Sequence, residues 1–137
     1  MAGYSQSGIS AYKKVSVHSE AVEADPYQLI CMLMDGALER LKVAKAAMLR
    51  NDKVTKAQVL HRVVEILDEL RASLNHKAGG QIAENLEKLY DYMIRRTLAA
   101  NLQDDIKAVD EVNNLLSEIR NAWGAIPPAD RVAKVAS

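Results

Sequence analysis

The histidines and carboxylates are the residues of this chain most capable of metal chemistry. His61 and Glu65 lie four residues apart, so they would share one face of a helix. Helical bundles hold di-iron centres through paired Glu-x-x-His motifs. Here Gln58 occupies the place three residues before His61, and no second pair of this kind exists. The other histidines, His18 and His76, fall in an N-terminal arm and a turn. The sequence therefore predicts neither a metal site nor a cofactor.

The single cysteine and the glycine pair are the remaining candidates for chemistry. Cys31 has no histidine or cation three or four residues away, which favours a small packed thiol over a nucleophile. A lone cysteine also excludes an internal disulfide and suits a reducing compartment. Gly79 and Gly80 lack the lysine and strand context of a phosphate-binding loop. No cluster of polar residues facing inward can be constructed, so we predict that the protein is not an enzyme.

Composition narrows the class of protein further. The chain has 137 residues, 49% hydrophobic and 26% charged, which is typical of one globular domain. Its 18 basic and 18 acidic residues leave no basic surplus for nucleic acid or an anionic membrane. No apolar run is long enough for membrane insertion, and no signal peptide is recognisable. We expect a soluble cytoplasmic protein.

Four amphipathic helices are predicted from the apolar spacing and the cap residues. Asp25-Pro26 is an N-cap followed by proline at the first helical position. Asp52 or Thr55 would cap a second helix over about 56–75, and Asp104 or Asp105 a fourth that ends at Gly124. The third would cover about 81–102, after a turn at Gly79-Gly80. The predicted core positions are Ile30, Met34, Ala37, Leu41, Ala44 and Met48, then Leu60, Val64, Leu67 and Leu74, then Ile82, Leu86, Leu89 and Met93, and finally Val109, Val112, Leu116, Ile119 and Trp123.

These elements predict an all-α fold, an antiparallel up-down four-helix bundle over residues 25–125. Residues 1–24 are expected to form a mobile N-terminal arm, and residues 126–137 a flexible C-terminal tail after Pro127-Pro128. No segment alternates with a period of two residues, so no strands are expected.

The second and third helices carry a second apolar stripe beside the first. Its members are Val59, Val63, Ile66 and Leu70 on the second helix, and Ala83, Tyr90, Ile94 and Leu98 on the third. Such broad stripes occur when a helix touches two neighbours in a bundle. They also occur when an exposed apolar groove receives an amphipathic partner helix. Periodicity alone does not decide between these two interpretations.

The two tyrosines of the third helix point in different directions, because each residue advances by about 100°. Tyr90 lies about 40° from Leu86, where it either lines a groove or caps the core. Tyr92 is predicted to be a half-buried residue near the solvent boundary. Asn101 lies level with the Tyr90 flank, and its amide could bind a partner's backbone or cap the helix end.

Several segments together resemble the FliS family of flagellar export chaperones. They are "DPYQLICMLMDGALERLKVAKAAM", "VEILDELRASLN", "GGQIAENLEKLYDYMIRRTLAAN" and "EVNNLLSEIRNAW". The likeness covers about residues 11–123. Its most specific parts are the Leu-x-x-Leu-Tyr-x-Tyr stretch over 86–92, the order in which the segments occur, and the proline-opened helix with Leu29, Leu33, Asp35 and Gly36. One departure is Met34, where the family is expected to have an aromatic residue. That change should affect packing and not function.

The resemblance implies a client and a mode of binding. FliS proteins bind the C-terminal segment of flagellin, which is disordered alone and folds onto the chaperone. Binding prevents premature filament polymerisation and keeps flagellin competent for the flagellar export apparatus. The family's N-terminal arm carries a tyrosine that covers a hydrophobic pocket until flagellin displaces it, and Tyr12 and Val17 occupy the matching place here. The predicted partner-binding residues are Tyr12, Val17, Ile66, Leu70, Leu74, Ala83, Tyr90, Ile94, Leu98 and Asn101. The alternative is a helical adaptor that homodimerises through the same stripes and has no flagellin client.

Overall fold

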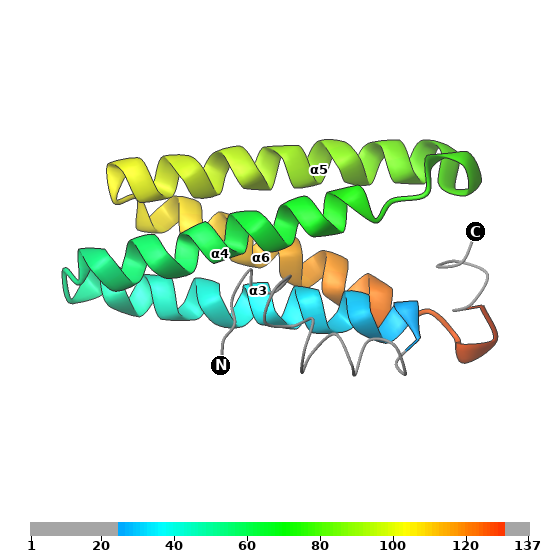
Figure 1. The fold of residues 1–137 in the computed structure, drawn as a ribbon, viewed down its shortest axis with the longest axis horizontal. Helices are drawn as coiled ribbons and strands as arrows, with labels where there is room; N and C mark the ends of the chain where they lie inside the picture. The colour runs from blue at the N-terminus through cyan, green and yellow to red at the C-terminus, as the bar shows by residue number, and fades with distance from the viewer. Residues whose placement is uncertain (1–24, 131–137) are drawn as a thin grey trace.

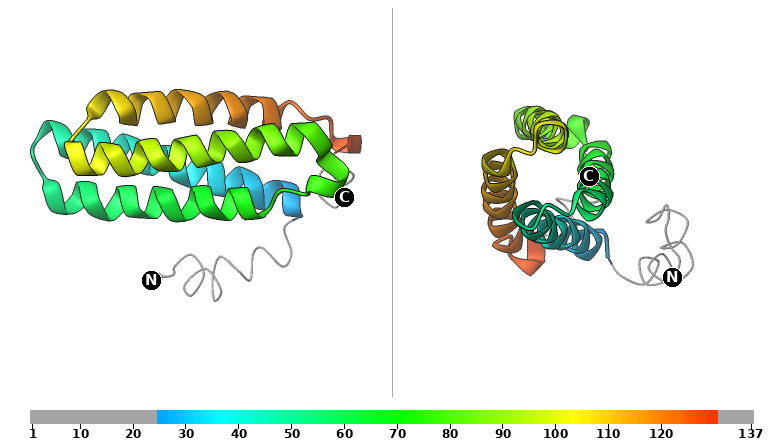
Figure 2. Two further views of the ribbon diagram at one scale, coloured as in Figure 1. Left: turned by 90° about the horizontal axis from the view of Figure 1, so that it is seen from above. Right: turned by 90° about the vertical axis from the view of Figure 1, so that its left-hand side faces the viewer.

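The computed structural model describes residues 25–130, in which four long helices pack side by side (Figure 1). They are α3 (Pro26–Leu49), α4 (Lys53–Ala72), α5 (His76–Gln103) and α6 (Ile106–Gly124). Viewed along the bundle, the helices occupy four corners, with α4 and α6 each lying between α3 and α5 (Figure 2). Short connections make neighbouring helices antiparallel. The predicted all-α bundle is confirmed.

Each of the four helices begins at an acidic or amide side chain that accepts a backbone hydrogen bond. The Oδ1 atoms of Asp25, Asp52, Asn75 and Asp105 accept from N–H groups three residues further on, at 2.7, 3.1, 3.0 and 3.2 Å. These bonds satisfy donors that a helix start otherwise leaves unpaired. The predicted cap at Asp25 is confirmed. Of the paired alternatives, Asp52 and Asp105 are the caps.

The boundaries of α4 and α5 differ from the predicted ones. Helix α4 covers Lys53–Ala72 instead of 56–75, because Asp52 caps it and Asn75 is already the cap of α5. Helix α5 begins with one turn from His76 and then kinks at Gly80. Gly80 has φ 52° and ψ −125°, a conformation that glycine adopts readily and other residues rarely do. The predicted glycine turn is therefore a kink inside α5.

The cores of α3 and α6 follow the predicted spacing. All six predicted core residues of α3 are buried. On α6, Val109, Val112 and Leu116 are buried, while Ile119 and Trp123 are half-buried. Alanines 37, 44 and 47 have no exposed surface, so other helices approach closely along α3.

The predicted cores of α4 and α5 are confirmed only in part. Leu60 and Leu67 of α4 and Met93 of α5 are buried as predicted. On α4 the second stripe supplies Val63, Ile66 and Leu70 to the core, and Val64 is only half-buried. On α5 the predictions for Ile82 and Leu89 are wrong, because their side chains are 69% and 37% exposed. The residues buried on α5 are Ala83, Tyr90, Met93, Thr97 and Ala100. Small residues at the last positions let α5 approach its neighbours, and the Thr97 hydroxyl is satisfied by donating to the Met93 carbonyl at 2.7 Å.

An aromatic pair joins the start of α3 to the end of α6. The rings of Tyr27 and Trp123 stack with centroids 5.3 Å apart and an interplanar angle of 12°. The Tyr27 hydroxyl donates to the Trp123 carbonyl at 3.0 Å, and Trp123 Nε1 donates to the Tyr27 carbonyl at 3.2 Å. We call this the aromatic end of the bundle.

Candidate functional site

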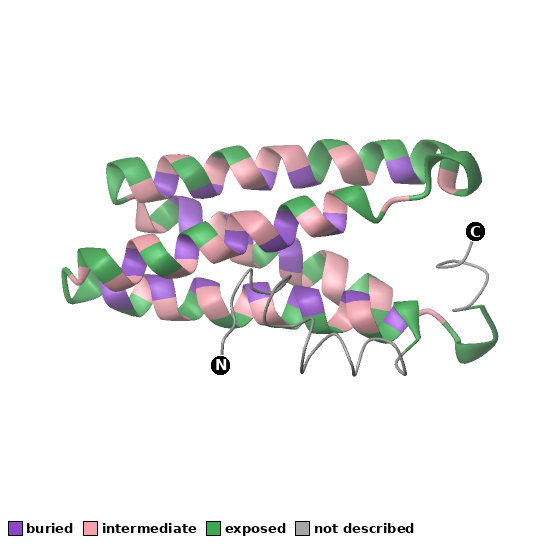
Figure 3. Ribbon diagram, viewed as in Figure 1, coloured by how far each residue is buried: buried purple, intermediate pink, exposed green. Residues whose placement is uncertain are grey.

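The predicted partner-binding residues divide into buried and accessible groups. Figure 3 shows how buried and exposed positions alternate along the four helices. Ile66, Leu70, Ala83 and Tyr90 lie in the core. Leu74, Ile94 and Asn101 are half-buried, and Leu98 is 53% exposed. Tyr12 and Val17 lie outside the described residues. The structure thus brings only part of the predicted set to the surface, and contact of any of them with a client stays a prediction.

The accessible members on α5 lie on the side of this helix that faces α4, while Leu74 lies in the α4–α5 connection. Asp91 of α5 forms an ion pair with Arg71 of α4, which fixes the position of this flank. Ile94 and Leu98 follow Asp91 by three and seven residues, so they continue the same stripe. Leu102 extends it one turn further and is 83% exposed. We call Ile94, Leu98 and Leu102 the α4-side flank.

One charged pair, Arg71 of α4 with Asp91 of α5, joins α4 to α5 beside this flank. Arg71 donates to both Asp91 and Asp68. These hydrogen bonds, that to Asp91 first, raise the pKa of the Arg71 guanidinium above its ordinary value. The pairing fixes the approach of the two helices beside apolar side chains that remain open to solvent.

The two tyrosines of α5 have separate structural roles. Tyr90 is buried in the core, and this burial raises the pKa of its hydroxyl to about 12. Tyr92 is half-buried, as predicted, and its hydroxyl donates to Glu111 Oε2 of α6 at 2.6 Å. Arg96 Nε donates to the other oxygen of Glu111 at 2.8 Å. The bonds from Tyr92 and Arg96 lower the pKa of Glu111, and the bond to Glu111 raises the pKa of Tyr92. Tyr92 therefore joins α5 to α6.

A second apolar strip lies on the opposite flank of α5, toward α6. Its exposed members are Ile82 and Leu89, and the half-buried Leu86, Leu115 and Ile119 lie in the partly buried layer against the core. We call Ile82 and Leu89 the α6-side flank. The sequence predicts both residues in the core, because the two stripes of α5 are equally apolar and periodicity cannot rank them.

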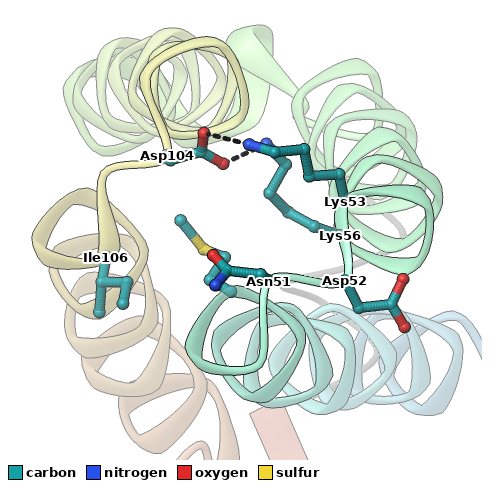
Figure 4. Close-up of a pocket in the computed structure, with 7 residues that line it drawn as sticks. Asn51, Asp52, Lys53, Lys56, Asp104 and Ile106 are labelled. Carbon is teal, nitrogen blue, oxygen red and sulfur yellow. Dashed lines mark hydrogen bonds and ion pairs between the residues drawn. The ribbon is translucent and has the colours of Figure 1, made fainter.

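The end of the bundle opposite the aromatic pair contains a small polar cavity (Figure 4). It measures about 160 Å³, and its lining residues are Met48, Asn51, Asp52, Lys53, Lys56, Asp104 and Ile106. Lys56 is buried, and its ammonium donates to Asp104 Oδ1 at 2.5 Å and to the Asn101 carbonyl at 2.9 Å. Lys53 Nζ donates to Asp104 Oδ2 at 3.1 Å. We call this the lysine end; no periodicity or motif in the sequence predicts it.

Electrostatics and backbone geometry together hold the lysine end in shape. Hydrogen bonds from Lys56 and then Lys53 lower the pKa of Asp104, so its carboxylate is charged at neutral pH. Asp104 and Asn51 both adopt left-handed backbone conformations, with φ of 53° and 60°. Asp and Asn tolerate this region better than most residues. The α3–α4 and α5–α6 connections therefore meet around two lysines and one shared carboxylate.

The histidine considered for metal binding lies on the surface. The Nε2 atom of His61 is 3.5 Å from Glu65 Oε2, and the same carboxylate accepts a hydrogen bond from Arg62 at 3.1 Å. Within residues 25–130, no group of three potential metal ligands comes together. No helix in the described part of the chain is long and apolar enough to cross a membrane.

Residues 25–130 form a four-helix bundle with apolar side chains exposed along α5. Residues 8–130 match the family described as flagellar protein FliS. A flagellar secretion chaperone FliS from Salmonella typhimurium is 48% identical over 126 residues, which cover 91% of this chain and 93% of that protein. The FliS of Vibrio cholerae is 42% identical over 120 residues, which cover 88% of each chain, and that of Escherichia coli is 38% identical over 121 residues, which cover 88% of this chain and 89% of its own.

The chain belongs to the FliS family of flagellar secretion chaperones. This family is not enzymatic, in agreement with the prediction from the sequence.

Proposed function

We propose that this protein is a cytoplasmic chaperone that binds the disordered C-terminal segment of flagellin. In this role it prevents premature filament polymerisation and delivers flagellin to the flagellar export apparatus in a secretable state. Membership of a family of flagellar secretion chaperones supports the proposal. A disordered client that folds on binding gains affinity by burying apolar side chains along an extended surface.

The α4-side flank is the surface that we assign to flagellin, and its exposed leucines carry the proposal. Ile94, Leu98 and Leu102 recur every four residues on α5, so they present one continuous strip. An amphipathic helix can bury such a strip with anchors at matching spacing. Complete burial of one leucine side chain stabilises a complex by about 1.5–3 kcal/mol before ordering costs are deducted.

The other predicted residues take secondary places in this proposal. Asn101 and Leu74 would contact the client at the two ends of the α4–α5 surface. Ile66, Leu70, Ala83 and Tyr90 are core residues in the unbound chain, so a client reaches them only if α4 and α5 separate on binding. Tyr12 and Val17 are proposed to cover the surface until flagellin displaces them.

Calorimetry with a synthetic peptide of the flagellin C-terminal segment tests the assignment. Leu98→Asp places a charge in the middle of the α4-side flank and should weaken binding at least tenfold. Ile82→Asp is the matched control, because Ile82 is similarly exposed on the same helix but lies on the α6-side flank. Circular dichroism should show equal helicity for both variants. Normal binding by Leu98→Asp, or equal losses in the two variants, would place the client elsewhere.

Deletion of residues 1–17 tests the proposed lid separately. Removing a competing segment should tighten peptide binding, because the client no longer has to displace it. Unchanged or weaker affinity, with no added aggregation, would argue against the lid. Light scattering on the full chain separates the chaperone from the dimerising adaptor, since only the chaperone is expected to be monomeric alone and one-to-one with flagellin.

A further inference from the structure

The two ammonium groups of the lysine end carry more N–H donors than the described acceptors around them receive. An ammonium group carries three N–H donors and no acceptor. Among the described residues, Lys56 uses two donors and Lys53 uses one, and Asp104 is the carboxylate that both share. Three of the six N–H groups therefore remain for a ligand.

The charges that face the cavity favour an anion. Asp52 also lines the cavity, but its carboxylate turns away from the two lysines (Figure 4). Its oxygens accept from the Thr55 N–H and from Arg50. Two ammonium groups thus share one carboxylate at the mouth of the cavity, which leaves one positive charge there. A second carboxylate would balance it and accept the remaining donors.

Exposed apolar side chains lie at the same end of the bundle as the cavity, and one of them belongs to the α4-side flank. Leu49, Val54 and Leu102 are all more than two-thirds exposed, and they lie at the ends of α3, α4 and α5 that meet there. Leu102 is also the last member of the α4-side flank. A chain lying along that flank from Ile94 through Leu98 would therefore arrive at Leu102 and the two lysines.

We infer that Lys53 and Lys56 bind the α-carboxylate at the C-terminus of the client. This inference rests on the proposed function, because it takes the flagellin C-terminal segment as the occupant of the flank. A cavity of about 160 Å³ is smaller than ordinary small-molecule pockets, which begin near 300 Å³, and suits the end of a chain. The inference also fixes the direction of the client: its last residue lies at the lysine end.

Two synthetic peptides of the flagellin C-terminal segment, one with a free C-terminal carboxylate and one with a C-terminal amide, test this inference. Amidation removes the charge and leaves every other atom of the client segment in place. The wild-type protein should bind the acid about tenfold more tightly than the amide, as expected for charge-assisted hydrogen bonds. In Lys53→Gln the preference should shrink to about threefold or less. Lys53 is suitable because its side chain is 71% exposed, so its replacement should not disturb the core.

Lys45→Gln is the matched control. Lys45 also pairs with an aspartate, at 2.9 Å from Asp110, but it belongs to neither the cavity nor the flank. Its replacement should leave the preference for the acid unchanged. Asp104→Asn should strengthen binding of the acid about threefold, because it removes the competing carboxylate, and asparagine tolerates the left-handed backbone at this position.

The outcomes separate this inference from the proposed function. If neither peptide binds, the proposed function fails and the inference fails with it. Equal binding of acid and amide by the wild type would overturn the inference alone. A preference that persists in Lys53→Gln, or weaker acid binding by a fully helical Asp104→Asn, would also overturn it. Weakening of both peptides alike by Lys53→Gln would show that the lysines hold a side-chain carboxylate instead.

Discussion

The two ends of the bundle are closed by different kinds of interaction. At the aromatic end, stacked rings and two neutral hydrogen bonds join Tyr27 of α3 to Trp123 of α6. At the lysine end, about 36 Å away along α3, Lys53 and Lys56 of α4 hold Asp104 at the end of α5. Stacking and neutral bonds do not respond to salt or acid, whereas ion pairs respond to both.

This difference assigns the ends different tasks. The aromatic end satisfies its own donors and gives α3 and α6 a fixed alignment. Among the described residues, the lysine end has N–H donors without an acceptor and one shared carboxylate, and we propose that it exchanges this internal partner for the client's carboxylate. A chaperone that must bind and later release a client benefits from a surface with both a rigid frame and exchangeable charges.

Loss of the indole should lower the stability of the fold more than any other change proposed here. Trp123→Ala removes the ring stack and the Nε1 donor, and should lower the free energy of unfolding by about 2–3 kcal/mol, since Trp123 is half-buried. Urea unfolding monitored by circular dichroism measures this change. Trp123→Phe is the control, because it retains a ring and should lose less. If Trp123→Ala lowers the free energy of unfolding no more than an ordinary substitution at an exposed position, the aromatic pair does not hold this end of the bundle together.

Removal of one hydroxyl should have a smaller effect on stability, and its salt dependence should distinguish a neutral hydrogen bond from a charged one. Tyr27→Phe keeps the stack but removes the bond to the Trp123 carbonyl, and should cost about 1 kcal/mol. The cost should be the same at low and high salt, because the bond is neutral. Tyr92→Phe, which removes a bond to the charged Glu111, provides the contrasting variant, and its cost should fall as salt is added. Similar salt dependence for both would contradict the distinction.

Acid should weaken the lysine end selectively, with the smallest effect of the three. The pKa of Asp104 is lower in the folded chain than its usual value of about 3.9. Its bridge therefore stabilises the fold above about pH 4 and loses this contribution as pH falls through the folded pKa. The difference in melting temperature between wild type and Asp104→Asn should be greatest near pH 7 and shrink below pH 4. A difference that does not change with pH would show that the bridge contributes nothing to folded stability.

The sequence predicted the four helices well. It predicted only part of the residues that α4 and α5 turn toward the core. Caps such as Asp25 act within three residues, and α3 has one apolar stripe, so local patterns were sufficient. Helices α4 and α5 each carry two stripes, and the choice between Leu89 and Tyr90 for the core depends on how all four helices pack together. Periodicity cannot supply that information.

The surface residues were predicted less completely for a related reason. Leu98 and Ile94 were identified because they belong to a stripe, although that stripe also contains the buried Tyr90. Lys56 carries no periodic signal, and its partner Asp104 lies 48 residues further on. Only the folded chain brings these two residues together, so the sequence does not predict the lysine end.

Trp123 is the only tryptophan of the chain, and it belongs to the aromatic end. Its emission therefore reports on that end alone, while far-ultraviolet dichroism averages over every helix. If client binding alters only the lysine end and the α4-side flank, the indole spectrum should stay constant as complexes form. An engineered second fluorophore near Leu49 would then give each extremity of the molecule its own optical signal.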